Sequence, residues 1–313
     1  MSLPVPRPLF NAGLRPFAKL VFPPAASWGT QRFRMRLLLA WPGTPRDVTV
    51  ETIEFAGRPA ELLTPAGVEP GRVLLYLHGG GYCVGSPRTH RAVVGRLATQ
   101  LRAVAYVTDY RLAPEHPFPA AFDDTLAAYQ ALLEAGWAAE QIFVAGDSAG
   151  GGLTLALGIA AVQRALPLPA ALGLLCPGID FTPAALGLLP KDGREPALTP
   201  ALMARFGRTY LGDADRADPR ISSLLADLTG LPPLVIDTAE YDILLSQSRR
   251  LAACATEAGV HVRYREHGGL GHAFQCAAGL LRHADLAVDA LAADLLAAAH
   301  RSARGGRAHP ETA

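Results

Sequence analysis

The sequence predicts an α/β protein built on a mostly parallel, eight-stranded sheet that is flanked by helices. Short apolar runs alternate with longer helical runs from about residue 72 to residue 299, an alternation typical of βαβ units. An antiparallel hairpin pattern precedes this alternation, and half of the 313 residues are apolar, enough for one large buried core. A parallel sheet buried on both faces follows from these observations.

The pattern predicts eight strands in order along the chain. The first two form the hairpin, which spans residues 48–63, where apolar and polar residues alternate with the period of a strand. Five more are short, mostly apolar runs, at residues 72–77, 103–108, 141–145, 172–176 and 233–237, and the last strand is expected at residues 262–266.

Helices are expected between these strands and at both ends, at residues 9–22, 88–101, 120–133, 153–162, 200–210, 243–258 and 284–299. The first is amphipathic, with Phe10, Leu14 and Phe17 on one face and Arg15 and Lys19 on the other. Packing against its own domain, or a lid over a cleft, is favoured over contact with a membrane surface, because the helix is short and carries only two cations. Residues 31–41 fit no element, and their three arginines are expected to form a solvated face.

Three parts of the chain are expected. Residues 1–47 form an N-terminal cap segment, residues 48–300 form the catalytic domain with a cap insertion at about 180–215, and residues 301–313 form a disordered tail. The two cap segments lie outside the strand–helix alternation. Open α/β sheets place their sites at the carboxyl ends of the strands, so the cap is expected there.

The composition excludes several classes of function. A net charge of +1 indicates no nucleic-acid partner, and the four scattered cysteines have neither zinc-site spacing nor the density of a disulfide framework. Prolines interrupt the first eight residues, which argues against a signal peptide, and no apolar stretch is long enough for stable membrane insertion. A soluble cytoplasmic protein without a metal site is expected, and a homodimer is left open.

One serine has the sequence context of a nucleophile. Ser148 lies in Gly146-Asp147-Ser148-Ala149-Gly150, between an apolar strand and an apolar helical run. A strand, a sharp turn and a helix in this order push the serine side chain out of the sheet, and the flanking glycines let strand and helix approach closely. This context predicts the nucleophile elbow of a serine hydrolase, with an ordinary glycine-rich turn as the alternative.

A glycine-rich loop offers backbone donors for an oxyanion. The run His78-Gly79-Gly80-Gly81 leaves the end of a strand, so the N–H groups of Gly79 and Gly80 can face a cavity, with the N–H of Ala149 as a third donor. A phosphate-binding loop is disfavoured because neither GxGxxG nor GxxxxGK[ST] is present. His78 is expected to hold this loop through hydrogen bonds.

A base and an acid must complete such a site. His272, in the loop after the last strand, is favoured as the base over His267, which ends that strand. Asp242, after the strand at 233–237, is favoured over Glu240 as the acid that orients the histidine, although Asp242 could also be only a helix N-cap. Asp147, next to the serine, is expected to anchor a neighbouring loop.

Four motifs occur in one order: His78-Gly79-Gly80-Gly81, Asp109-Tyr110-Arg111-Leu112-Ala113-Pro114, Gly146-Asp147-Ser148-Ala149-Gly150-Gly151 and Gly271-His272-Ala273-Phe274. From about residue 72 to 275 the chain resembles the hormone-sensitive-lipase-like esterases of the α/β-hydrolase fold. The resemblance implies a Ser148–Asp242–His272 triad, oxyanion donors at Gly79, Gly80 and Ala149, a helical cap, no cofactor, and small-molecule esters of short to medium acyl chains as substrates. One departure is the run Asp242-Ile243-Leu244-Leu245-Ser246, where similar proteins usually have Asp-Pro-Leu followed by a second Asp.

The expected function is therefore a serine carboxylesterase that works through an acyl-enzyme intermediate. A hydrolase-like ligand receptor is one alternative, disfavoured because the chain keeps both the serine and the histidine. Acyl transfer, lactone opening and amide hydrolysis would use the same residues, and the sequence does not separate them from ester hydrolysis.

Overall fold

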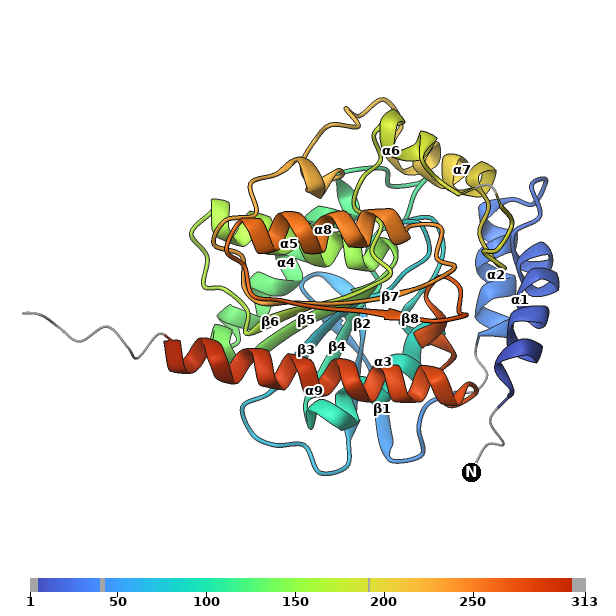
Figure 1. Cartoon of the computed structure of the whole chain (residues 1–313). Coiled ribbons are helices and arrows are strands. Elements are labelled where there is room, and N and C mark those ends of the chain that lie inside the picture. Colours follow the sequence, from blue (N-terminus) through green and yellow to red (C-terminus); the bar gives the residue numbers. More distant parts are fainter. Residues whose placement is uncertain (1–4, 40–42, 191, 306–313) are drawn as a thin grey trace, which may run out of the picture.

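One sheet of eight strands, in the order β1-β2-β4-β3-β5-β6-β7-β8, forms the centre of the computed structural model, which describes residues 5–39, 43–190 and 192–305 (Figure 1). The strands are β1 Val48–Phe55, β2 Arg58–Pro65, β3 Val73–Leu77, β4 Val104–Thr108, β5 Ile142–Asp147, β6 Ala171–Leu175, β7 Leu234–Ala239 and β8 Val262–His267. β2 pairs antiparallel with β1 and with β4, and all other neighbours are parallel. The predicted fold class and the eight strands are confirmed.

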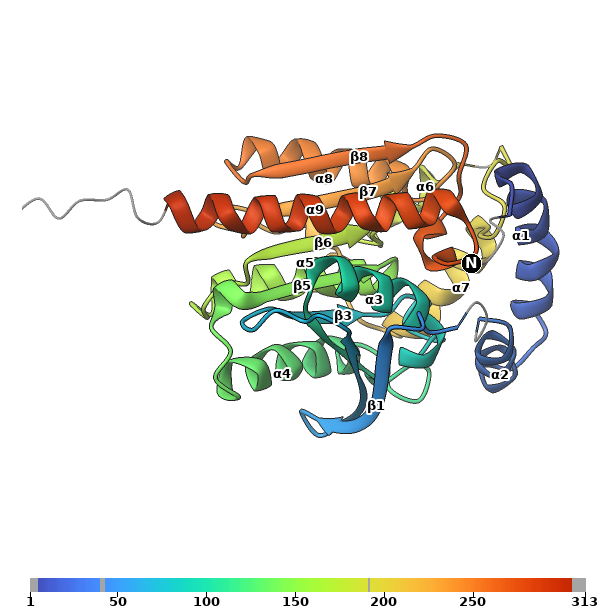
Figure 2. The same ribbon diagram turned by 90° about the horizontal axis from the view of Figure 1, so that it is seen from below.

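Helices cover both faces of this sheet (Figures 1 and 2). α3 Pro87–Leu101 and α9 Arg282–Gly305 lie on one face, and α4 Ala120–Glu134, α5 Ala149–Gln163 and α8 Leu245–Glu257 lie on the other. Successive strand residues point to opposite faces, so Leu74 belongs to the core under α3 and α9, whereas Leu75 belongs to the core under α4 and α5. The central strands β3, β5, β6 and β7 are buried on both sides, as expected for the interior of a parallel sheet.

Glycines allow the strand–turn–helix around residue 148 to form. A Cβ on Gly150 would overlap the carbonyl oxygen of Leu77 at the end of β3, and a Cβ on Gly146 would lie 2.5 Å from the carbonyl oxygen of Gly150. Any side chain at either position would push α5 away from the sheet. These contacts explain the glycine pattern that the sequence shows.

Four helices lie beyond the sheet edge at which β3 and β5 end. They are α1 Arg7–Val21, α2 Trp28–Leu38, α6 Pro183–Gly187 and α7 Pro200–Leu211. In Figures 1 and 2, α1 and α2 occupy one end of the molecule, next to α7. Residues 28–38, to which the sequence pattern assigned no element, form α2, whose N-terminus is capped by the Ser27 hydroxyl.

The expectation of three solvated arginines in this stretch is wrong for Arg32. Its guanidinium donates to the carbonyl oxygens of Cys83 and Ala113 and forms an ion pair with Glu115, with N···O distances between 2.6 and 3.0 Å. Arg32 therefore ties α2 to the loops that follow β3 and β4. Arg36 does remain exposed.

The C-terminal helix is longer than expected. α9 continues through residues 301–305, where the sequence pattern suggested a disordered tail, and the rest of that tail, 306–313, lies outside the described residues. All four cysteines are free thiols. Among the described residues, no helix combines the length and the apolar character needed to cross a bilayer.

Candidate active site

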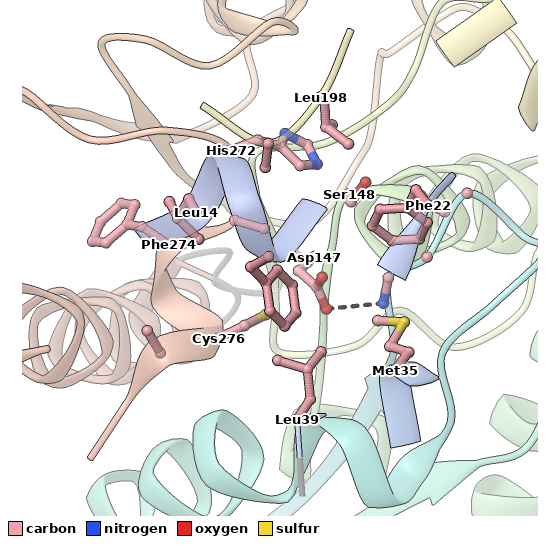
Figure 3. Close-up of a pocket in the computed structure, with 18 of the residues that line it drawn as sticks. Leu14, Phe22, Met35, Leu39, Asp147, Ser148, Leu198, His272, Phe274 and Cys276 are labelled. Carbon is pink, nitrogen blue, oxygen red and sulfur yellow. Dashed lines mark hydrogen bonds between the residues drawn. The ribbon is translucent and has the colours of Figure 1, made fainter. Parts of the chain in front are cut away.

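Ser148 lies at the apex of the turn between β5 and α5. Its backbone angles are φ 54° and ψ −116°, a region that residues other than glycine rarely adopt. The strain is maintained because Ser148 N–H donates to the carbonyl oxygen of Leu175 on β6, while its own carbonyl oxygen accepts from Gly152 and Gly178. The turn thus holds the serine side chain at the carboxyl end of β5, at the edge of a cavity (Figure 3).

His272 and Asp242 are in direct contact. His272 Nδ1 lies 2.7 Å from Asp242 Oδ1, and both side chains are almost fully buried. Asp242 also accepts from the Thr238 hydroxyl at 3.1 Å and from the Leu244 N–H at 2.9 Å, so its orientation is fixed without the second aspartate of similar proteins. The carboxylate therefore keeps the proton of the neutral imidazole on Nδ1 and leaves the Nε2 lone pair free.

The second ring nitrogen of His272, Nε2, does not contact a carboxylate as Nδ1 does. Its Nε2 is buried and makes no hydrogen bond within the part of the chain that the structure describes. Figure 3 shows the His272 imidazole and the Ser148 hydroxyl lining one cavity. Burial alone would lower the pKa of His272, but the charge of Asp242 and their hydrogen bond outweigh it and raise that pKa above its ordinary value.

The two competing residues lie elsewhere. His267 Nε2 contacts Asp237 Oδ2 at 3.1 Å, and Glu240 accepts from Arg194 at 2.7 Å and from the Gly269 N–H at 2.8 Å. Neither His267 nor Glu240 lines the cavity that contains Ser148. Of the candidate pairs, the structure brings Asp242 together with His272.

The backbone donors differ from the expectation at one position. Gly79 lines the cavity, but its N–H donates to the buried Asp147 Oδ1 at 3.0 Å and is therefore already engaged. Gly80, Gly81 and Ala149 line the cavity, and their N–H groups make no hydrogen bond to another described residue. The physical reason is that Asp147 needs donors once it is buried, and the nearest backbone amide supplies one.

Asp147 is the centre of a buried polar network. Its Oδ1 accepts from the Tyr76 hydroxyl at 3.0 Å as well as from Gly79, and it lies 3.4 Å from His90 Nε2. Burial would raise the pKa of Asp147, but the positive charge and hydrogen bond of His90, with the bond from Tyr76, lower it to about 2. The expected role of Asp147 as the anchor of a neighbouring loop agrees with these bonds, because that loop is the glycine-rich one.

His78 supports the same loop from behind. Its Nδ1 lies 2.9 Å from the carbonyl oxygen of Gly79, and its ring stacks on Tyr110 with centroids 4.2 Å apart. Burial, with the nearby His90, lowers the pKa of His78 to about 3, so the ring is neutral at ordinary pH. This arrangement agrees with the structural role predicted for His78.

The cavity beside Ser148 is large and mostly apolar, with a volume of about 530 Å³. The inner faces of α1 and α2, the segment around α7 and the loop after β8 supply its walls. Apolar side chains from these elements include Phe10, Leu14, Phe17, Met35, Leu38, Leu198, Met203, Phe206, Phe274 and Leu280.

Sequence reasoning missed Glu195, which is buried beside the histidine. Its Oε2 accepts the backbone N–H of His272 at 2.9 Å, and its Oε1 accepts the N–H of Ala197 at 2.8 Å. Burial raises the pKa of Glu195. The local pattern Glu195-Pro196 contains no signal for this role, because its partner is 77 residues further along the chain.

Within the described residues, two clusters have the residue types of metal ligands. They are His90–Asp147–Cys276 and Cys176–Asp242–His272, and within each the candidate ligand atoms lie within 4.8 Å of one another. In both clusters the carboxylate is already held by hydrogen bonds, from Tyr76 and Gly79 in the first and from Thr238 and Leu244 in the second. Hydrogen bonding to a buried carboxylate is enough to account for each cluster.

Comparison with known proteins adds to this geometry. A family model described as the alpha/beta hydrolase fold matches residues 74–276. An acetyl-hydrolase of Streptomyces hygroscopicus is 39% identical over 213 residues, which are 68% of this chain and 71% of that protein. The carboxylic ester hydrolase LipN of Mycobacterium tuberculosis is 36% identical over 262 residues, which are 78% of this chain and 69% of that protein.

A solved structure extends the similarity to the whole architecture. The crystal structure of an esterase from the bacterial hormone-sensitive lipase family has a TM-score of 0.86 and is 32% identical. The match covers 94% of this chain and 98% of that one.

Proposed function

The chain belongs to the hormone-sensitive-lipase-like carboxylesterases of the α/β-hydrolase fold and is a carboxylic-ester hydrolase. From this premise we propose that it is a serine esterase that acts on short- to medium-chain esters of small molecules. The observation that carries the proposal is the 2.7 Å contact between Asp242 and His272 beside the strained turn of Ser148. A nucleophile, a base and an orienting acid are the three groups that acyl transfer through serine requires.

In the proposed mechanism, Ser148 Oγ attacks the ester carbonyl while His272 Nε2 takes the hydroxyl proton. The alkoxide leaves with that proton, and an acyl-enzyme remains on Ser148. His272 then removes a proton from water, the resulting hydroxide attacks the acyl carbonyl, and Ser148 leaves with the proton. Asp242 stabilises the imidazolium that forms in both steps.

The negative oxygen of each tetrahedral intermediate needs fixed donors. We assign this role to the N–H groups of Gly80, Gly81 and Ala149, with Gly81 in place of Gly79. Ala149 is the first residue of α5, so its N–H has no partner within the helix and lies at the positive end of the helix dipole. Removing one such donor costs roughly 3 kcal/mol of transition-state stabilisation.

The preference for chain length is proposed from the cavity. An apolar space of about 530 Å³ lies within the range of roughly 300–1,000 Å³ typical of sites for small organic ligands. Each buried methylene contributes about 0.8 kcal/mol, so acyl chains longer than acetyl gain binding energy there. The inner faces of α1, α2 and the segment at 180–215 line this space, which supports their role as a cap over the catalytic domain.

Active-site labelling tests the serine mechanism. A fluorophosphonate probe followed by peptide mass spectrometry should give one adduct, on Ser148, and Ser148→Ala should lose both the adduct and turnover of p-nitrophenyl butyrate. A panel of p-nitrophenyl esters from acetyl to palmitoyl should show its highest kcat/KM at a medium chain length. Full activity in Ser148→Ala, or an adduct elsewhere, would overturn the proposal.

A further inference from the structure

The outward faces of α1 and α2 expose large apolar side chains. Leu9 and Leu20 on α1 are 65% and 52% exposed, and Phe33 and Leu37 on α2 are 67% and 66% exposed. Leu9 and Leu20 are about three helical turns apart, and Phe33 and Leu37 about one, so each pair shares one side of its helix. Large exposed apolar side chains that gather on one part of a surface commonly mark an interaction site.

The two helices lie side by side at one end of the molecule (Figures 1 and 2). Arg34 of α2 donates to the carbonyl oxygen of Leu20 at 2.9 Å, which joins α2 to the C-terminal end of α1. Exposed cations accompany the apolar side chains: Lys19 precedes Leu20, and Arg36 precedes Leu37. We call these six residues, Leu9, Lys19, Leu20, Phe33, Arg36 and Leu37, the outer face.

Charge is unevenly divided between this end and the rest of the protein. Residues 1–46 contain seven of the 29 basic residues and none of the 28 acidic ones. The N-terminal part therefore carries a formal charge of +7, although Arg32 is paired with Glu115, whereas residues 47–313, with 22 basic and 28 acidic residues, carry −6. An anionic surface would attract the N-terminal helices and repel the remainder, so it would orient the molecule with α1 and α2 toward it.

Another side of each helix lines the cavity that contains Ser148. Phe10, Leu14 and Phe17 of α1, with Met35 and Leu38 of α2, form part of its wall. Leu9 also borders this cavity, whereas the other five residues of the outer face do not line it. A surface that binds the outer face and holds apolar esters would therefore lie next to the helices that cover the cavity.

We propose that the outer face docks onto the surface of an anionic phospholipid bilayer. Leu9, Leu20, Phe33 and Leu37 enter the boundary between headgroups and acyl chains, and Lys19 and Arg36 contact the phosphate groups, as in amphipathic helices that lie in the membrane interface. A bilayer is favoured over a nucleic acid because the cations are interspersed with large aliphatic and aromatic side chains. The binding is peripheral and reversible, and it adds to the proposed esterase function without depending on it.

Vesicle co-sedimentation of the full chain tests this proposal without any substrate, so its result does not depend on catalysis. Vesicles of phosphatidylcholine with 30% phosphatidylglycerol should bind the protein at about 20 mM salt, and vesicles of phosphatidylcholine alone should bind it far less. Raising the salt to about 500 mM should release most of the protein, because screening weakens the attraction.

Two matched double variants locate the binding face. K19E/R36E should weaken binding to the anionic vesicles by about 25-fold or more, since each basic residue near such a surface contributes roughly fivefold. The control variant R164E/R301E makes the same change of charge at two exposed residues far from the outer face. Arg164 lies at the end of α5 that is remote from Ser148, and Arg301 lies near the C-terminal end of α9. This variant should bind the anionic vesicles within about twofold of the wild type. F33S/L37S should weaken binding at every salt concentration.

None of these variants alters a residue that lines the cavity, so hydrolysis of soluble p-nitrophenyl butyrate and the circular dichroism spectrum should stay at wild-type values. Binding that is equal for neutral and anionic vesicles, an equal loss in R164E/R301E, or no sedimentation of the wild-type protein would each overturn the proposal. If the wild-type protein bound the vesicles but showed no serine-esterase activity, only the proposed function would be overturned.

Discussion

Glu195 Oε2 accepts the backbone N–H of His272 at 2.9 Å. Glu195 precedes α7, and His272 follows β8, so this bond connects the segment over the cavity to the loop of the proposed base. The two segments also pack closely, because a Cβ on Gly271 would lie 2.6 Å from Pro196 Cδ. Part of the proposed cap therefore holds the histidine loop in place.

Glu195→Gln is expected to lower kcat while KM changes little. Glutamine keeps one carbonyl oxygen but replaces the other acceptor with an NH₂ group, so either the His272 N–H or the Ala197 N–H loses its partner. A looser histidine loop should reduce kcat for p-nitrophenyl butyrate by about tenfold, a modest effect for the displacement of a catalytic group. Glu134→Gln, at an exposed position at the end of α4, is the control and should match the wild type.

The pH dependence of activity should reflect the environment of His272. The ring must be neutral to accept a proton, and its pKa is raised above 6.5, mainly because the charge and hydrogen bond of Asp242 exceed the opposing effect of burial. Activity should therefore begin to fall at a pH above 6.5 and should be lost as the pH decreases further. A profile of kcat/KM against pH checks this, and an inflection well below 6.5 would contradict it.

The same profile distinguishes positioning by Glu195 from a purely structural role. The negative charge of Glu195 contributes to the raised pKa of His272, so Glu195→Gln should move the acid inflection to lower pH. A variant that only destabilised the fold would reduce the amount of active enzyme without moving the inflection.

Asp147→Asn should destabilise the protein and impair catalysis. The substitution removes the charge that pairs with His90 and one acceptor oxygen of the carboxylate that holds Tyr76 and Gly79. Breaking a buried ion pair costs about 3–5 kcal/mol of unfolding free energy, which urea denaturation measures. Asp213→Asn, at an exposed position after α7, is the control and should unfold like the wild type.

Asp147 also sets a dependence of stability on pH. Its pKa is lowered from 3.8 to about 2 in the folded protein, so its contribution is fully present above the unfolded value of 3.8. That contribution should disappear as the pH falls through about 2. Between pH 4 and pH 2, the urea midpoint of the wild type should therefore decrease more than that of Asp147→Asn.

Leu14→Trp should shorten the acyl chains that the enzyme accepts. Leu14 lines the cavity from α1, and a larger side chain there fills space that a medium acyl chain would occupy. Since each buried methylene contributes about 0.8 kcal/mol, the loss of about two methylenes should reduce kcat/KM for an octanoyl ester relative to an acetyl ester roughly tenfold. Leu20→Trp, on the exposed side of the same helix, should keep the wild-type ratio; equal ratios in both variants would argue against this assignment.

The local sequence pattern predicted those elements whose conformation depends mainly on neighbouring residues. The alternation of strands and helices, the turn at Ser148 and the histidine loop after β8 were all placed from the order and spacing of residues. Such patterns are informative because backbone hydrogen bonding and burial repeat with fixed periods along the chain. α2 escaped prediction because Arg32, Arg34 and Arg36 alternate with Phe33, Met35 and Leu37, and an alternation with a period of two does not indicate a helix.

The sequence by itself determined that Ser148 would project from a glycine-flanked turn at the end of a buried strand, because that conformation depends on neighbouring residues. Only the tertiary structure decided that Asp147 takes the Gly79 amide, that Asp242 rather than Glu240 faces His272, and that Glu195 holds the histidine loop. These choices join residues between 30 and 77 positions apart, and they follow from which buried carboxylate lies nearest to an unsatisfied donor once the sheet has formed.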